Sequence, residues 1–91
     1  MKIDIFAEIT ELRYRGERSC VFVIKSGPSE LVCTVTYHKL HLAPLVKEGR
    51  EIILSGTLKA RRRFRKGVEY VDNILYVEGI EVITRSPKEV H

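Results

Sequence analysis

The chain has 91 residues, of which 44% are hydrophobic and 31% are charged, and its net charge is +4. This length and composition indicate one globular domain and exclude a disordered or collagen-like chain. The longest apolar run, residues 20–24, is too short to cross a membrane, and Asp4 and Glu8 interrupt any N-terminal signal segment. Cys20 and Cys33 stand 13 positions apart, which is no disulfide framework. We therefore expect a cytoplasmic domain with reduced cysteines and no association with a membrane.

Alternation of apolar with polar residues predicts strands along most of the chain, because successive side chains of a strand point to opposite faces. Gly27 and Pro28 provide the turn of a hairpin. Residues 38–48 form the one plausible helix, although Pro44 interrupts its middle. Gly56 and Gly79, inside expected strands, indicate bulges. Strands are expected over residues 2–10, 20–25, 31–37, 52–61 and 69–84, with polar loops over residues 13–18 and 62–67.

Three strands, a short helix and two more strands follow one another in the order typical of the OB-fold. The sequence therefore predicts an all-β domain over residues 1–84, a five-stranded OB-fold Greek-key barrel with a short helix between strands 3 and 4. Residues 85–91 are expected to form a frayed tail. An SH3-like barrel is the alternative, but it usually lacks a helix at this position.

Positive charge is concentrated in two short segments. Residues 59–66 carry six basic side chains and no acid, and residues 13–18 carry three arginines and one glutamate. The rest of the chain has seven basic and eleven acidic residues, a net charge of −4. Charge focused in this way indicates an anionic partner. In an OB-fold these segments correspond to the two loops that bind oligonucleotides together with strands 2 and 3.

The second half of the chain resembles a known family. Residues 48–58, followed by the basic segment and by residues 70–83, are similar to bacterial-type single-stranded DNA-binding proteins, to the related primosomal replication proteins and to anticodon-binding OB domains. The resemblance covers roughly half of the chain. It implies single-stranded nucleic-acid binding, with DNA favoured over RNA, in DNA replication, repair or recombination.

Single-strand binding needs cations for phosphates and flat side chains for bases. Phe64 and Tyr14 lie between arginines and are the best candidates for stacking, unless Phe64 folds back onto the barrel. Tyr37 and Tyr70 either stack on bases or close the ends of the barrel. In an alternating strand Arg61 and Arg63 share the face of Lys59, and Arg62 points to the other rim. The expected phosphate contacts are Arg13, Arg15, Arg18, Lys59, Arg61, Arg62, Arg63, Arg65 and Lys66.

Other functions are less well supported by the sequence. No nucleophile with a base, acid pair or phosphate loop is visible, so we expect no enzyme and no cofactor. Cys20 and Cys33 stand alone, and His38 with His41 provides too few ligands for zinc, so no metal site is expected. Two alternatives stay open: a small OB-fold assembly subunit of a larger complex, such as one for replication or repair, and an RNA-binding OB domain. A homo-oligomer, such as a dimer, is compatible with all of these functions.

Overall fold

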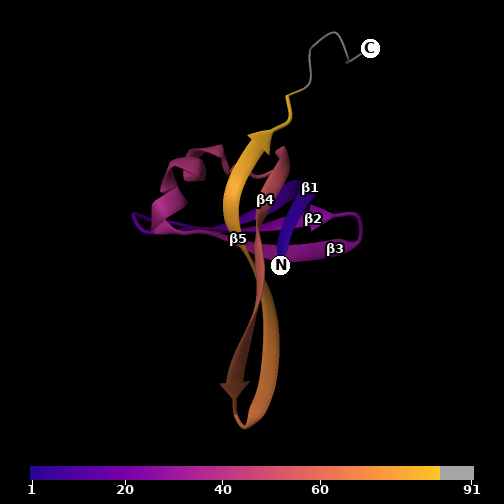
Figure 1. Ribbon diagram of the computed structural model, residues 1–91, viewed down its shortest axis with the longest axis vertical. Coiled ribbons are helices and arrows are strands. Elements are labelled where there is room, and N and C mark those ends of the chain that lie inside the picture. The colour runs from indigo at the N-terminus through magenta and orange to yellow at the C-terminus, as the bar shows by residue number, and fades with distance from the viewer. Residues whose placement is uncertain (85–91) are drawn as a thin grey trace.

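The structure is a computed structural model that describes residues 1–84, so the predicted tail of residues 85–91 lies outside the described residues (Figure 1). Within residues 1–84 the chain forms five strands and one 3-10 helix, in the predicted order. The elements are β1 (Lys2–Arg15), β2 (Cys20–Ser26), β3 (Ser29–Val35), η1 (Tyr37–Leu45), β4 (Glu51–Arg65) and β5 (Val68–Val82).

The five described strands form one sheet that closes on itself. Strand β1 pairs with both β2 and β4, and β5 lies between β3 and β4. All neighbours are antiparallel except β3 and β5, which run parallel. Closure in the order β1-β2-β3-β5-β4 leaves each strand paired on both sides over part of its length, which protects the edges of a small sheet.

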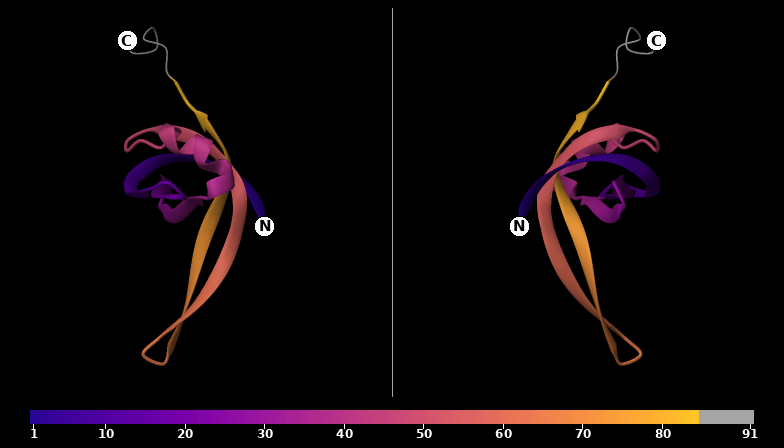
Figure 2. Two further views of the ribbon diagram at one scale, coloured as in Figure 1. Left: turned by 90° about the vertical axis from the view of Figure 1, so that its left-hand side faces the viewer. Right: turned by 90° about the vertical axis from the view of Figure 1, so that its right-hand side faces the viewer.

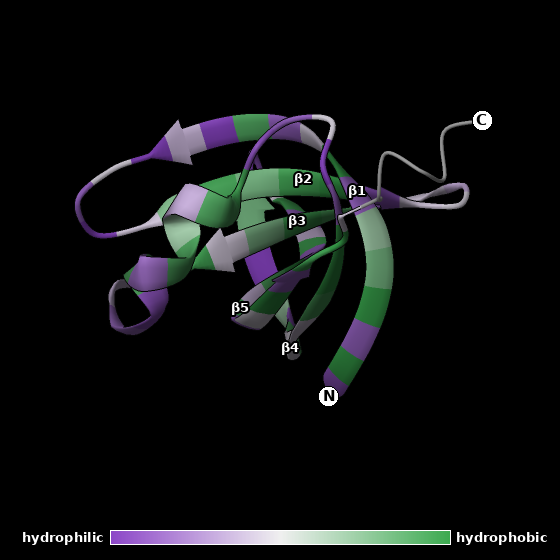
Figure 3. Cartoon of the chain, turned by 90° about the horizontal axis from the view of Figure 1, so that it is seen from above, coloured by the Kyte–Doolittle hydropathy of each residue, from purple (hydrophilic) through white to green (hydrophobic). Residues whose placement is uncertain are grey.

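The core fills the inside of this closed sheet. Phe22, Ile24, Leu54 and Leu75 are fully buried there, and Val46, just after the helix, covers one end. Hydrophobic and hydrophilic positions alternate along β1 in Figure 3, so one face of the strand packs inward and the other meets solvent. Alternation of this kind is the pattern from which the strands were predicted.

The helix differs from its prediction. It is a 3-10 helix over Tyr37–Leu45 rather than a helix over residues 38–48, and it is kinked at Lys39. Pro44 lies in its last turn, where its missing N–H limits regular helical bonding. The end of the helix is fixed by two arginines, because Arg50 Nη1 donates to the Leu45 carbonyl at 2.9 Å and Arg15 donates to the Val46 carbonyl.

The predicted loop over residues 62–67 is wrong. Strand β4 continues to Arg65 and β5 begins at Val68, so only Lys66 and Gly67 form the turn. Both have positive φ, 53° and 77°, as in the two-residue turns that match the twist of a hairpin. The polar composition of residues 62–67 is typical of a loop, but these residues belong to a hairpin of β4 and β5 that projects far beyond the closed sheet (Figures 1 and 2). We call this projecting hairpin, residues 60–73, the arm.

Strand β1 is also longer than predicted. It runs to Arg15, so residues 13–15 of the expected loop lie in the strand and residues 16–19 make the connection to β2. Register shifts between Ile9 and Glu11 and between Leu12 and Tyr14 bend it around the sheet. A third shift, between Ser55 and Gly56 opposite β5, agrees with the bulge predicted near Gly56 and Gly79.

Candidate nucleic-acid interface

A row of four residues crosses the exposed side of the sheet. Tyr14 of β1 pairs with Val21 of β2, Val21 with Thr34 of β3, and Thr34 with Tyr76 of β5. Residues that face each other in paired strands share a face of the sheet. Three strand spacings of about 4.8 Å therefore place the two tyrosines about 14 Å apart on one surface. We call the surface that carries this row the outer face.

A second row lies one step toward the arm. It joins Val23, Val32 and Ile74, and Ile74 pairs with Lys59 of β4. The small and branched side chains make a flat apolar floor between the strands. Lys59 Nζ lies 5.1 Å from the centroid of the Tyr76 ring, which places a cation directly beside an aromatic side chain.

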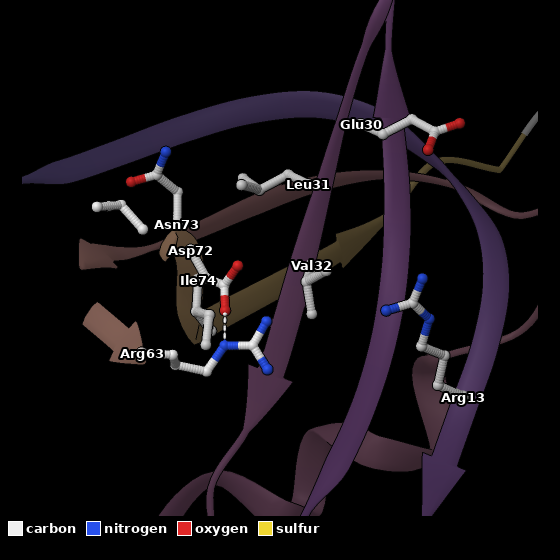
Figure 4. Close-up of a pocket in the computed structure, with 9 residues that line it drawn as sticks. Arg13, Glu30, Leu31, Val32, Arg63, Asp72, Asn73 and Ile74 are labelled. Atoms are coloured by element: carbon white, nitrogen blue, oxygen red, sulfur yellow. Dashed lines mark ion pairs between the residues drawn. The ribbon is translucent and has the colours of Figure 1, made fainter. Parts of the chain in front are cut away.

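A groove of about 490 Å³ lies where β5 leaves β3 and enters the arm. Val32 and Ile74 line its floor, and Arg13 and Arg63 lie on its two sides (Figure 4). Arg63 Nε is 2.5 Å from Asp72 Oδ2, and Arg13 Nε is 2.9 Å from Glu11 Oε2. The carboxylates hold the two guanidinium groups over the outer face, and the groove presents cations above an apolar floor.

The arm is rich in positive charge. Along β4 the residues Lys59, Arg61, Arg63 and Arg65 alternate with Ala60, Arg62 and Phe64, so the first set shares the outer face, as predicted for Lys59, Arg61 and Arg63. Within the arm, residues 60–73, five basic side chains oppose only Glu69 and Asp72. The arm is therefore strongly cationic.

The reverse side of the arm is also exposed. Phe64 is 75% exposed, so it does not fold back onto the closed sheet. It pairs with Glu69 across the hairpin, and Arg62, on the same face, pairs with Val71. Arg62 Nε lies 3.5 Å from Glu69 Oε1. Near the tip, Phe64 and Tyr70 line a hollow of about 440 Å³ together with Arg63 and Arg65. Lys66 completes the tip in the turn itself.

The remaining predicted residues lie at the opposite end of the outer face. Arg18 is exposed in the connection between β1 and β2, and Tyr37 is 67% exposed at the start of η1, where its ring meets His38 edge-on. Arg15 has a structural contact, because its Nη2 donates to the Ala43 and Val46 carbonyls. The structure therefore places Arg18 and Tyr37 at one end of the outer face and the arm at the other, whereas Arg13 lies beside the groove at the base of the arm.

Sequence reasoning missed part of this surface. Tyr76, Val32 and Ile74 were not among the predicted site residues, although each is in a predicted strand. Alternation assigns them to one of two faces, but only the pairing of β3 with β5 shows that their face also carries Tyr14. That pairing joins segments about 40 residues apart, and no local pattern reveals it.

The cysteines and histidines lie apart from this surface. Burial raises the pKa of the Cys33 thiol to about 12, and burial also raises the pKa of Cys20, against the effect of Arg15 nearby. Both thiols therefore stay protonated inside the core. Among the described residues no group of three or more His, Cys, Asp or Glu side chains is placed to hold a metal. No helix within residues 1–84 is long and apolar enough to span a membrane.

The fold is similar to those of solved single-stranded DNA-binding proteins. The mitochondrial protein Rim1 of S. cerevisiae matches with a TM-score of 0.70 and 18% identity, over 94% of this chain and 97% of its own. The small single-stranded DNA-binding protein of Streptomyces coelicolor matches with a TM-score of 0.62 and 14% identity, over 91% and 94%. The Plasmodium falciparum SSB, solved in complex with ssDNA, matches with a TM-score of 0.60 and 13% identity, over 90% and 91%.

No protein-family model matches the chain, and no curated protein matches its sequence. The structural similarity confirms the predicted fold, which is that of the OB-fold single-stranded DNA-binding proteins. The sequence identities of 13–18% support this conclusion about the fold alone.

Proposed function

We propose that the protein binds single-stranded nucleic acid, DNA in preference to RNA, along the outer face. The observation that carries this proposal is the row from Tyr14 to Tyr76, which brings two aromatic rings from distant parts of the chain onto one flat surface. Bases stack on such rings without regard to sequence. The apolar floor of Val23, Val32 and Ile74 supports the bases that lie between the rings.

The charge pattern supports the same function. Arg13 lies at one side of the outer face, and Lys59, Arg61 and Arg63 continue it onto the arm. Cations at both sides can follow the phosphates of a strand that crosses the sheet. The two ion-paired arginines, Arg13 and Arg63, keep further N–H donors, because a guanidinium has five.

The other predicted residues extend the proposed binding surface or support the fold around it. Arg18 and Tyr37 extend the surface at its far end, and Arg65, Lys66 and Tyr70 extend it along the arm. Arg15 acts mainly by holding η1 against β1. The structural neighbours, which are single-stranded DNA-binding proteins, favour DNA as the ligand and a role in replication, repair or recombination.

Fluorescence anisotropy tests the proposal with a labelled dT oligomer, its RNA equivalent and a blunt duplex, each across a salt series. We expect micromolar or tighter binding of the single strands and weaker binding of the duplex. Four to six phosphate contacts predict a log–log salt slope of about −3 to −4, at roughly −0.7 per contact. Absence of single-strand binding at low salt would overturn the proposal, and the ratio of DNA to RNA affinity decides between the two polymers.

A second candidate function, assembly with another protein or with a second copy, rests on a different surface. Phe6 of β1 and Ile53 of β4 face each other across the sheet and are 54% and 40% exposed. Asp4, Glu8 and Glu81 surround them. An exposed apolar pair with an acidic rim fits a partner that is apolar and basic. Light scattering of the wild type and of Phe6→Ser tests this candidate, because a dimer through this surface should dissociate in the variant.

A further inference from the structure

The arm extends beyond all contact with β3. Strands β3 and β5 pair only from Val32 and Ile74 to Thr34 and Tyr76. From Ala60 paired with Asn73 to the tip, the described strands β4 and β5 pair only with each other. These six residue pairs span about 20 Å, at roughly 3.4 Å per residue. The arm is therefore a free two-stranded ribbon with both faces open to solvent.

Both faces of the ribbon carry residues suited to nucleic acid. Arg61, Arg63 and Arg65 continue the outer face, whereas Arg62 and Phe64 lie on the reverse face. A single strand that crosses the outer face contacts only the first set. A ligand that surrounds the ribbon on both sides would contact the exposed phenyl ring and the guanidinium of the reverse face as well.

The major groove of a nucleic-acid duplex has that property. It is about 12 Å wide and 8.5 Å deep, it admits a two-stranded β-ribbon, and phosphates border it on both sides. The two acids of the arm, Glu69 and Asp72, each lie beside one arginine, Arg62 and Arg63. Arg61, Arg65 and Lys66 add charge that these acids do not balance. Phe64, near the tip, can contact a thymine methyl group at the floor of the groove.

We propose that the reverse face of the arm is a second binding site, which takes duplex, and that the protein binds at junctions between single-stranded and double-stranded DNA. The single-stranded half of this inference rests on the proposed function. The two sites are continuous, because Lys59 and Ile74 belong both to the second row of the outer face and to the base of the arm. A DNA single strand that leaves the outer face beside Ile74 can therefore continue into double-stranded DNA at the base of the arm.

Anisotropy with three DNA substrates tests the inference: a single-stranded dT tail, a blunt duplex, and the same duplex carrying that tail. For the wild-type protein we expect the tailed duplex to bind at least about tenfold more tightly than the tail alone, through a few additional phosphate contacts. Equal affinities for the tail and the tailed duplex would overturn the inference and leave the proposed function intact. Failure to bind the tail at all would instead overturn the proposed function.

Two variants locate the additional contacts. Arg62→Ala with Phe64→Ala, on the reverse face, should reduce the ratio of tailed-duplex to tail affinity toward one. The matched variant Tyr14→Ala, on the outer face, should weaken the binding of both substrates and keep their ratio. All three side chains are exposed, so both proteins should fold, which circular dichroism verifies. If the reverse-face variant keeps the ratio and sedimentation shows that it has lost a dimer, the reverse face binds a second copy and the inference is wrong.

Discussion

Lys59 places its ammonium group 5.1 Å from the centre of the Tyr76 ring, on the outer face of the sheet. The pair joins β4 to β5 at the point where the closed sheet ends and the arm begins. Under the proposed function, a base that stacks on Tyr76 would take the place of the ammonium, which would then lie next to the phosphate of that base. The proposed interface therefore has one aromatic residue and one cation in contact at its centre.

Removal of the Tyr76 ring should weaken single-strand binding. Tyr76→Ala should cost about 1–3 kcal/mol of binding free energy, the usual value for a base stacked on an aromatic residue. Tyr76→Phe keeps the ring and should bind within about twofold of the wild type. Anisotropy with a dT oligomer measures both, after thermal denaturation has shown that the variants are folded. Equal losses in the two variants would mean that the hydroxyl, and not the ring, contacts the ligand.

Removal of two outer-face arginines should change the salt dependence of binding. Arg61→Ala with Arg63→Ala removes two phosphate contacts, so the log–log slope should become less negative by about 1.4. A salt titration of dT binding measures the slope. The matched control, Lys47→Ala, removes an exposed cation between η1 and β4 that does not line the groove, and it should leave the slope unchanged. An unchanged slope in the double variant would contradict the assignment of these arginines.

Arg15 should contribute to folding through the end of the 3-10 helix. Its Nη2 donates to the Ala43 carbonyl at 3.2 Å and also to the Val46 carbonyl. Arg15→Ala leaves those carbonyls without this donor and should lower the free energy of unfolding by about 1–3 kcal/mol. Arg18→Ala, in the neighbouring connection, is the matched control and should change stability by less than about 0.5 kcal/mol. Urea denaturation measures both, and equal values would show that Arg15 does not anchor the helix.

Gly56 should tolerate no side chain. A Cβ at this position would lie 2.3 Å from the Tyr76 carbonyl oxygen, a backbone atom that cannot move aside without shifting β5. Gly56→Ala should therefore destabilise the fold by about 1–3 kcal/mol, as overpacked sites do. At Gly79 the new Cβ would meet only the Ser55 hydroxyl, which can rotate away. Gly79→Ala should consequently be milder, and thermal denaturation of the two variants tests this order.

Stability should fall at alkaline pH because of Cys33. The buried thiol has its pKa raised from 9.0 to about 12, so between these values the unfolded chain releases a proton that the folded chain retains. The contribution of Cys33 is therefore complete below pH 9.0 and is lost as the pH rises toward 12. Urea denaturation from pH 8 to 11 should show a shallower decline for Cys33→Ala than for the wild type. If the free energy of unfolding declined with pH equally in the two proteins, the raised pKa of Cys33 would be contradicted.

Much of the fold could be predicted from the sequence. Alternation located five strands, and Gly27 with Pro28 located the hairpin of β2 and β3 correctly. The arm could not be predicted, because the polar run from Arg61 to Arg65 has no buried face to show its alternation. Its strand conformation depends on pairing with residues 68–72 and on the turn at Lys66 and Gly67. The helix was predicted too long for a similar reason, since hydrogen bonds from Arg15 and Arg50 fix its end.

The candidate site was predicted only in part. The charged residues were visible as two basic segments, and Tyr14 and Phe64 stand out between arginines. The apolar floor and Tyr76 were not visible, because their position on the outer face follows from the register of β3 against β5. The register of β4 against β5 places Phe64 on the reverse face of the arm rather than beside Tyr14.

Methyl NMR of isoleucine-labelled protein tests most directly whether the outer face binds the strand. Ile74 lies on the floor of the groove, whereas Ile53 lies beside Phe6 where β1 pairs with β4, on a part of the closed sheet that does not line the groove. Titration with a dT oligomer should shift the δ1 methyl signal of Ile74 and leave that of Ile53 in place. A shift of the Ile53 signal with no change at Ile74 would contradict the account and would place the ligand on the acidic, apolar surface of β1 and β4.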